Sequence, residues 1–261
     1  MIQIGPRSLK NYLPQKLGGL AVKGHSQLNA EAQYIHANVA RNCAMGYQEV
    51  VPHDEQPTEI LLLAGGPSLA RMEGDIRSLN AEGMPIVTVN GTYNWCLQRG
   101  LRPGAQIILD SRTFNQRFVE PAIPGCKYLL ASQCAANVMD AVPRDKLWMW
   151  HGEHGQYIVP GGSTVILRAI PLLIMLGFRN IHIYGFDSCL DGDEHHAYEQ
   201  AENANQMAVK VHYHERIFNC HGWMVTQAQE FCDMQRMLPD NINLAVYGDG
   251  LIAHIIRSCA H

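Results

Sequence analysis

From residue 58 onward, short runs of consecutive apolar residues alternate with segments that have helical periodicity. We predict buried strands over 60–64, 86–90, 106–110, 128–132, 147–151, 181–185 and 242–247. Helices are predicted between them, over 69–81, 93–99, 134–141, 164–176, 226–237 and 250–257. Strands that are apolar throughout are covered on both faces, which is typical of parallel sheets. The pattern therefore predicts an α/β fold, with a Rossmann-like, mostly parallel sheet flanked by helices.

Composition narrows the class of protein further. Hydrophobic residues make up 47% of the 261 positions and charged residues 17%, which excludes wholesale disorder. The 20 Lys and Arg against 24 Asp and Glu argue against duplex nucleic acid as a partner, because such binders present a strong basic face. The longest nearly unbroken apolar stretch, 169–176, is far shorter than a membrane span. The 8 cysteines form no CxxC pair, which favours free thiols in a reducing compartment. We expect a cytoplasmic protein with no membrane partner. A homo-oligomer is compatible with this composition.

The first 57 residues differ from the rest of the chain. They are expected to form an N-terminal arm with one helix, over 28–45, followed by a linker over 52–57 that contains two prolines. Residues 58–261 are expected to form one Rossmann-like domain. The helix of the arm either packs on this domain or binds a partner.

Glycine-rich turns follow two of the predicted strands, at the edge of a parallel sheet where ligands bind. In the first turn, Gly65 and Gly66 allow close approach to a ligand, and Pro67 and Ser68 begin a helix whose N-terminus attracts phosphate. An ordinary tight turn explains this loop equally well.

The second turn has the same character. Gly161 and Gly162 precede Ser163 and Thr164, and one of these hydroxyls is expected to cap a helix with an anion-attracting N-terminus. Both turns are therefore candidates for nucleotide phosphate binding.

Polar side chains end two further strands. Asn90 can read a base or a sugar through its paired donor and acceptor groups, unless it only forms an Asn-Gly turn. Asp110 is a candidate nucleotide contact or metal ligand, with helix capping as its structural alternative.

An acidic stretch follows the strand over 181–185. Asp187 and Asp191 are candidate Mg²⁺ ligands, and Asp187, His195 and His196 are candidate catalytic residues, because clustered carboxylates and imidazoles suit metal binding and acid–base work. Ser188 is added to the nucleotide-binding set. A solvated acidic loop is the structural alternative.

Taken in order, these stretches resemble a known family. The segments 63–69, 89–91, 161–163, 176–181 and 184–187 are similar to those of the archaeal 6-hydroxymethylpterin diphosphokinase (MptE-like) family. That family includes flagellin-glycosylation motility accessory factors, and the same order of motifs resembles bacterial sialyltransferases that use CMP-sialic acid. Asn90, Ser163 and Asp187 fall on the matching positions.

Two departures separate the chain from the sialyltransferases. The glycine loop has Gly65 where they have Asn, and the segment 222–227 lacks their helix-opening histidine. The segment 192–198 resembles relatives encoded by bacteriophages.

The resemblance implies a nucleotide-dependent transferase, in which residues 58–261 form a nucleotide-binding transferase domain. If it follows the diphosphokinases, ATP donates a pyrophosphoryl group and Mg²⁺ neutralises the charge. The alternatives are a glycosyltransferase with a nucleotide-sugar donor and a nucleotide-binding protein without catalysis.

Overall fold

The computed structural model describes residues 30–192, 197–198 and 208–259. Eight strands form one sheet in the order β1-β6-β5-β4-β3-β2-β7-β10, and every neighbouring pair is parallel. The bounds are β1 Gln48–Glu49, β2 Ile60–Leu63, β3 Ile86–Val89, β4 Ala105–Ile108, β5 Lys127–Ala131, β6 Leu147–Trp150, β7 Asn180–Tyr184 and β10 Asn243–Val246. All seven predicted strands are present, so the predicted α/β fold is confirmed.

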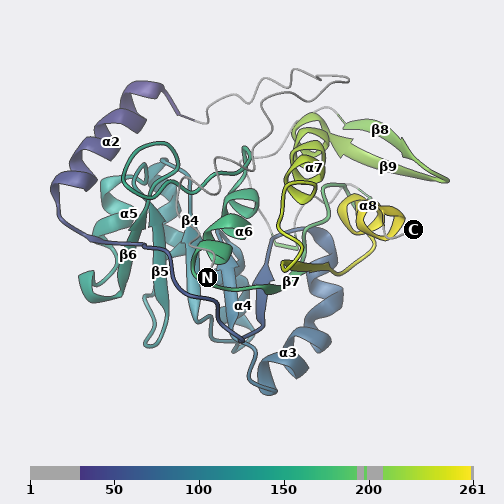
Figure 1. Cartoon of the computed structure of the whole chain (residues 1–261), viewed down its shortest axis with the longest axis horizontal. Coiled ribbons are helices and arrows are strands. Elements are labelled where there is room, and N and C mark those ends of the chain that lie inside the picture. The colour runs from purple at the N-terminus through teal and green to yellow at the C-terminus, as the bar shows by residue number, and fades with distance from the viewer. Residues whose placement is uncertain (1–29, 193–196, 199–207, 260–261) are drawn as a thin grey trace.

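Helices flank both faces of this sheet (Figure 1). The α-helices are α2 Ala32–Ala44, α3 Glu73–Ala81, α4 Thr92–Gln98, α5 Ala136–Asp140, α6 Val165–Met175, α7 Gly222–Gln235 and α8 Leu251–Cys259. Short 3-10 helices cover Pro67–Met72, Thr113–Phe118 and Arg144–Lys146. In the part of the chain that the structure describes, no helix combines the length and the apolar character needed to cross a membrane.

Strand β2 shows why its sequence is apolar without interruption. Ile60 and Leu62 pack into the cluster that contains the apolar side of α6, whereas Leu61 and Leu63 pack toward α3 and α4. All four side chains are fully buried. Burying one such side chain contributes about 1.5–3 kcal/mol, so a polar residue on either face of β2 would be costly.

Helix α2 packs on the body of the molecule, beside α5 (Figure 1). The side-chain amide of Asn42 donates to the carbonyl oxygens of Ser132 (2.9 Å) and Cys134 (2.8 Å). Arg41 donates to both carboxylate oxygens of Asp140, each at 2.7 Å. These bonds fix α2 against the loop that follows β5 and against the end of α5.

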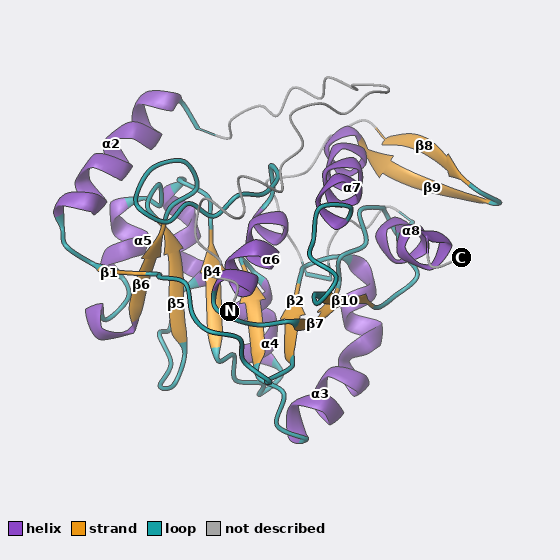
Figure 2. Ribbon diagram, viewed as in Figure 1, coloured by secondary structure: helices purple, strands orange, loops and turns teal. Residues whose placement is uncertain are grey.

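A separate hairpin was not expected from the sequence. Strands β8 (Ala208–Tyr213) and β9 (Arg216–His221) pair antiparallel and lead directly into α7 (Figure 2).

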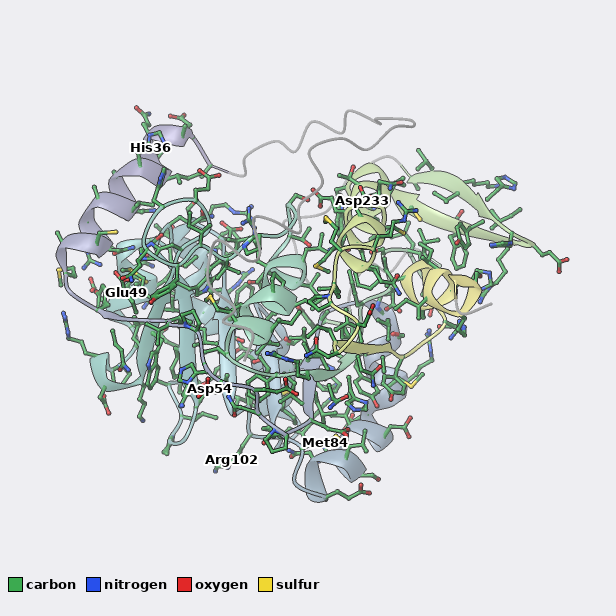
Figure 3. All side chains as sticks on the ribbon, in the orientation of Figure 1. His36, Glu49, Asp54, Met84, Arg102 and Asp233 are labelled. Atoms are coloured by element: carbon green, nitrogen blue, oxygen red, sulfur yellow. The ribbon has the colours of Figure 1, made fainter. Side chains whose placement is uncertain are left out.

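The strand order reverses once, between β2 and β7. Strands β2 to β6 step outward on one side, and the chain then returns to place β7 on the other side of β2. Met84 and Arg102, which precede β3 and β4, lie at the lower edge of the molecule in Figure 3, so the carboxyl ends of the strands point to the opposite edge. Such a reversal opens a crevice at the carboxyl ends, where open α/β sheets bind ligands.

Candidate functional site

Asp187 lies at this reversal, just beyond β7, and its carboxylate bonds to the loop after β2. Its Oδ2 accepts a hydrogen bond from the backbone N–H of Ser68 at 2.8 Å, and the residue is only 4% exposed. Burial raises the pKa of the Asp187 carboxyl, and the hydrogen bond from the Ser68 N–H opposes that rise. The Asp187 carboxylate occupies the space that a Cβ atom on Gly66 would need, and the next residue, Pro67, begins a 3-10 helix. Asp187 and Ser68 are thus brought together, but the Ser68 amide that we expected to bind phosphate is bonded to the chain itself.

The predicted Mg²⁺ ligands have other partners. Asp191 forms an ion pair with Arg71, which also binds Asp249 at 2.9 Å. The guanidinium of Arg71 therefore supplies the positive charge between these two carboxylates. Within residues 30–192, 197–198 and 208–259, no group of three or more His, Cys, Asp or Glu is arranged to hold a metal ion. The described residues do not form a Mg²⁺ ligand set, and Mg²⁺ stays a prediction. His195 and His196 lie outside the described residues.

The space between the turns after β2 and β3 is filled by Tyr198. A Cβ atom added to Gly91 would lie 2.5 Å from Cε2 of this ring, and one added to Gly65 would collide with its hydroxyl. The backbone N–H of Ala197 donates to the carbonyl oxygen of Gly65 at 2.9 Å, which holds the ring in place. Burial raises the pKa of the Tyr198 phenol. The close approach that Gly65 permits is therefore made by a side chain of the protein.

Two non-glycine residues beside this reversal of strand order have left-handed backbone conformations. Asn90 has a φ of 47° and Ser188 a φ of 50°. They follow β3 and β7, the two strands that pair with β2. The Oδ1 atom of Asn90 is buried and has no hydrogen-bond partner among the described residues. Asn adopts this region more readily than other non-glycine residues, whereas an ordinary residue such as Ser188 is destabilised there by about 1–2 kcal/mol. The backbone strain beside the turn after β2 therefore lies mainly at Ser188.

Asp110 is turned toward its own loop. Its Oδ1 accepts from the backbone N–H of Arg112 at 2.9 Å, and the Arg112 guanidinium binds the same carboxylate. The bond closes a local Asx-turn. The helix-capping alternative is wrong, because Arg112 precedes the 3-10 helix Thr113–Phe118 and that helix has no side-chain cap.

The glycine turn before α6 binds a carboxylate from α7. Oε2 of Glu230 accepts from the backbone N–H of Ser163 at 3.0 Å and from its hydroxyl at 2.8 Å. A Cβ atom on Gly162 would lie 2.6 Å from that oxygen, and one on Gly161 would meet the carbonyl of Leu167. The turn does bind an anionic group, as the sequence predicts for a helix N-terminus, but here it is a side chain.

Arg168 braces the same turn from below. Its guanidinium donates to the carbonyl oxygens of Val159 (2.8 Å), Gly162 (3.0 Å) and Gly152 (3.2 Å). Burial lowers the pKa of Arg168.

Gln227 of α7 connects this turn to the loop after β7. The Ser188 hydroxyl donates to Oε1 of Gln227, and Nε2 of Gln227 donates to the Thr164 hydroxyl, both at 2.7 Å. Gln227 is only 6% exposed. Ser188 and Thr164, which the sequence analysis assigned to one site, are thus joined through a residue that it missed.

Sequence reasoning also missed Tyr198 and Glu230. Gln227 and Glu230 are three positions apart on α7, so both project from the same side of that helix. Because α7 also carries Thr226, Gln229, Asp233 and Gln235, no local pattern in the sequence singled this pair out.

Comparison with known proteins places the chain in a family. The sequence model of the 6-hydroxymethylpterin diphosphokinase MptE-like family matches residues 35–193. No curated protein sequence matches the chain. The MAf glycosyltransferase from Magnetospirillum magneticum AMB-1 superposes with a TM-score of 0.67 at 15% identity, over 86% of this chain and 37% of that protein. The chain thus shares that fold and spans little more than a third of the glycosyltransferase.

A mammalian sialyltransferase in complex with Gal-beta-1-3GalNAc-ortho-nitrophenol aligns more weakly. Its TM-score is 0.42 at 11% identity, over 83% of this chain and 87% of the sialyltransferase, which is too low to support an argument. The family match takes in more than half of the sequence, and the chain therefore belongs to the 6-hydroxymethylpterin diphosphokinase MptE-like family.

Proposed function

We propose that this protein is a nucleotide-dependent transferase that binds its donor nucleotide at the crevice between β2 and β7. The observation that carries the proposal is the pair of left-handed residues, Asn90 and Ser188, which follow the two strands that flank β2. Backbone strain such as that at Ser188 clusters at functional sites, and both residues follow the ends of strands at which open α/β sheets bind ligands.

The chemistry of the flanking loops suits a nucleotide. The buried, unpartnered Oδ1 of Asn90 can accept a hydrogen bond from a base or a sugar hydroxyl. The N-terminus of α6 offers backbone N–H groups, which favour phosphate oxygens.

Family membership makes pyrophosphoryl transfer from ATP the first reaction to test, because the family is described by that diphosphokinase activity. The fold shared with a MAf glycosyltransferase supports the alternative, transfer of a sugar from a nucleotide-sugar donor.

A thermal-shift panel separates these reactions. ATP, ADP, CMP, CDP, UDP and GDP are each added with Mg²⁺ and with EDTA. A ligand at 100 times its Kd adds about 2.7 kcal/mol of stability, which raises the Tm by roughly 5–10 °C at this size. A Mg²⁺-dependent shift with ATP supports pyrophosphoryl transfer. A shift with CMP or a nucleoside diphosphate that survives EDTA supports glycosyl transfer. Tight binding without turnover supports a non-catalytic protein, and no shift with any nucleotide refutes the proposal.

Two glycine substitutions test the role of Asn90. Asn90→Gly removes the amide at a position whose φ glycine adopts freely, so the stability should stay within about 1 kcal/mol of wild type while nucleotide affinity falls about tenfold. His214→Gly is the matched control, because His214 has a φ of 51° in the turn of the β8–β9 hairpin. Equal affinities of the two variants would contradict the assignment of Asn90 to the site.

A further inference from the structure

Gln227 forms the middle of a chain of hydrogen bonds whose direction can be worked out. Ser188 is 6% exposed, whereas Thr164 is only half-buried. With Oε1 of Gln227 facing Ser188 and Nε2 facing Thr164, the buried Ser188 hydroxyl donates a hydrogen bond to Gln227, and Gln227 donates one to the Thr164 hydroxyl.

If the Gln227 amide were rotated by 180°, its NH₂ group would face Ser188, and the buried Ser188 hydroxyl would lose the acceptor for its hydrogen. Buried polar groups are almost always bonded, so the first orientation is favoured. The hydrogen of the Thr164 hydroxyl is then the free end of the chain, and it has no acceptor among the described residues.

Thr164 has the position of a helix cap without acting as one. It is the residue before α6, but its side chain makes no capping bond to that helix. Its oxygen instead accepts from Gln227, which leaves the hydroxyl as a donor beside the N–H groups that open α6. Each bond in such a chain polarises the next, which strengthens the terminal donor.

We propose that Gln227 is a positioning residue, which orients the Thr164 hydroxyl as a donor to a phosphoryl oxygen of the bound nucleotide. The inference rests on the proposed function, because it needs an anionic ligand at the N-terminus of α6. Gln227 would thereby make Thr164 a hydrogen-bond donor to the ligand. A ligand oxygen that accepts a hydrogen bond is then favoured at Thr164, and a ligand group that donates one is disfavoured.

Gln227→Glu tests the direction of the chain with little change in shape. A carboxylate accepts from both hydroxyls, so the Thr164 hydrogen turns inward and is lost to the ligand. We expect affinity for ATP or CMP, measured by calorimetry at pH 8, to fall about tenfold. At pH 5 the buried carboxyl takes up a proton and again donates to Thr164, so affinity relative to wild type at the same pH should recover. A residue that only braced the loops would show no such recovery.

Substitutions at Thr164 keep the test decisive if Gln227→Glu does not fold. Thr164→Val removes the donor and should weaken binding about tenfold, whereas Thr164→Ser should bind like wild type. In the Gln227→Glu/Thr164→Val double variant the losses should not add, because both remove one hydrogen bond.

The outcomes separate this inference from the proposed function. If wild type binds ATP or CMP and Thr164→Val or folded Gln227→Glu binds equally well, the role of Gln227 is overturned and the nucleotide site stands. If wild type binds neither nucleotide, nor inorganic pyrophosphate, both proposals are overturned.

Discussion

The bond between Glu230 and Ser163 places a negative charge at the N-terminus of α6, where the proposed nucleotide would place its phosphates. Glu230→Gln keeps an acceptor oxygen in reach of Ser163 and removes only the charge. Hydrogen bonds to charged groups contribute about 1.5–3 kcal/mol and neutral ones about 0.5–1.5 kcal/mol. Ser163 is exposed and Glu230 partly so, and solvent screening reduces the difference to about 1 kcal/mol. The Tm should therefore fall by about 2–4 °C.

Ligand affinity should change in the opposite direction. A charge at a helix N-terminus is worth about 0.3–1 kcal/mol, so removing the resident carboxylate should tighten pyrophosphate binding roughly two- to fivefold. Calorimetric titration with inorganic pyrophosphate and a parallel melting curve measure both effects. Asp233→Asn removes the same charge from α7, where Asp233 is labelled in Figure 3, and should leave affinity unchanged. If Glu230→Gln weakens pyrophosphate binding, the carboxylate does not compete with the ligand and the reasoning is refuted.

Three further predictions concern stability. Because burial raises the pKa of Asp187, the folded state binds more protons than the unfolded state just above pH 4, and stability is lost as pH rises through that pKa. Asp187→Asn should remove this loss, and a difference in Tm from wild type that stays constant between pH 4 and 7 would contradict it. Gly91→Ala should cost about 1–3 kcal/mol by colliding with Tyr198, and Tyr198→Ala in the same chain should recover most of it in urea unfolding. Arg168→Met should lower the Tm by roughly 6–12 °C, because three carbonyl oxygens lose a donor; a drop under 2 °C would mean that water replaces it.

The central sheet could be read from the sequence because parallel strands need apolar residues on both faces. The β8–β9 hairpin was missed although Ala208–Tyr213 largely alternates apolar and polar residues, which is the pattern of a half-exposed strand. This pattern differs from the uninterrupted apolar runs that mark the strands of the sheet. The turn of the hairpin also lacks the glycine that usually marks a hairpin, and His214 adopts the left-handed backbone instead.

Two turns of the candidate site could be located from the sequence, but the groups that fill them could not. Glycines marked the turns where a close approach occurs. The groups that approach Gly65 and Gly162 are Tyr198 and Glu230, which come much later in the chain. A glycine indicates that another group lies close to the backbone. The identity of that group depends on tertiary packing between residues far apart in the sequence, which a local sequence pattern does not reveal.

The central position of β2 has a consequence for synthesis. One edge of β2 pairs with β3 soon after it emerges, but Ile60 on the other edge waits for Ile181 of β7. At 5–20 residues per second the ribosome needs roughly 6–24 s to supply that partner. During this interval four consecutive aliphatic residues present an open edge, the kind of segment that templates aggregation. Yield on expression should therefore depend on how fast residues 64–180 are translated, and on chaperones that cover β2 meanwhile.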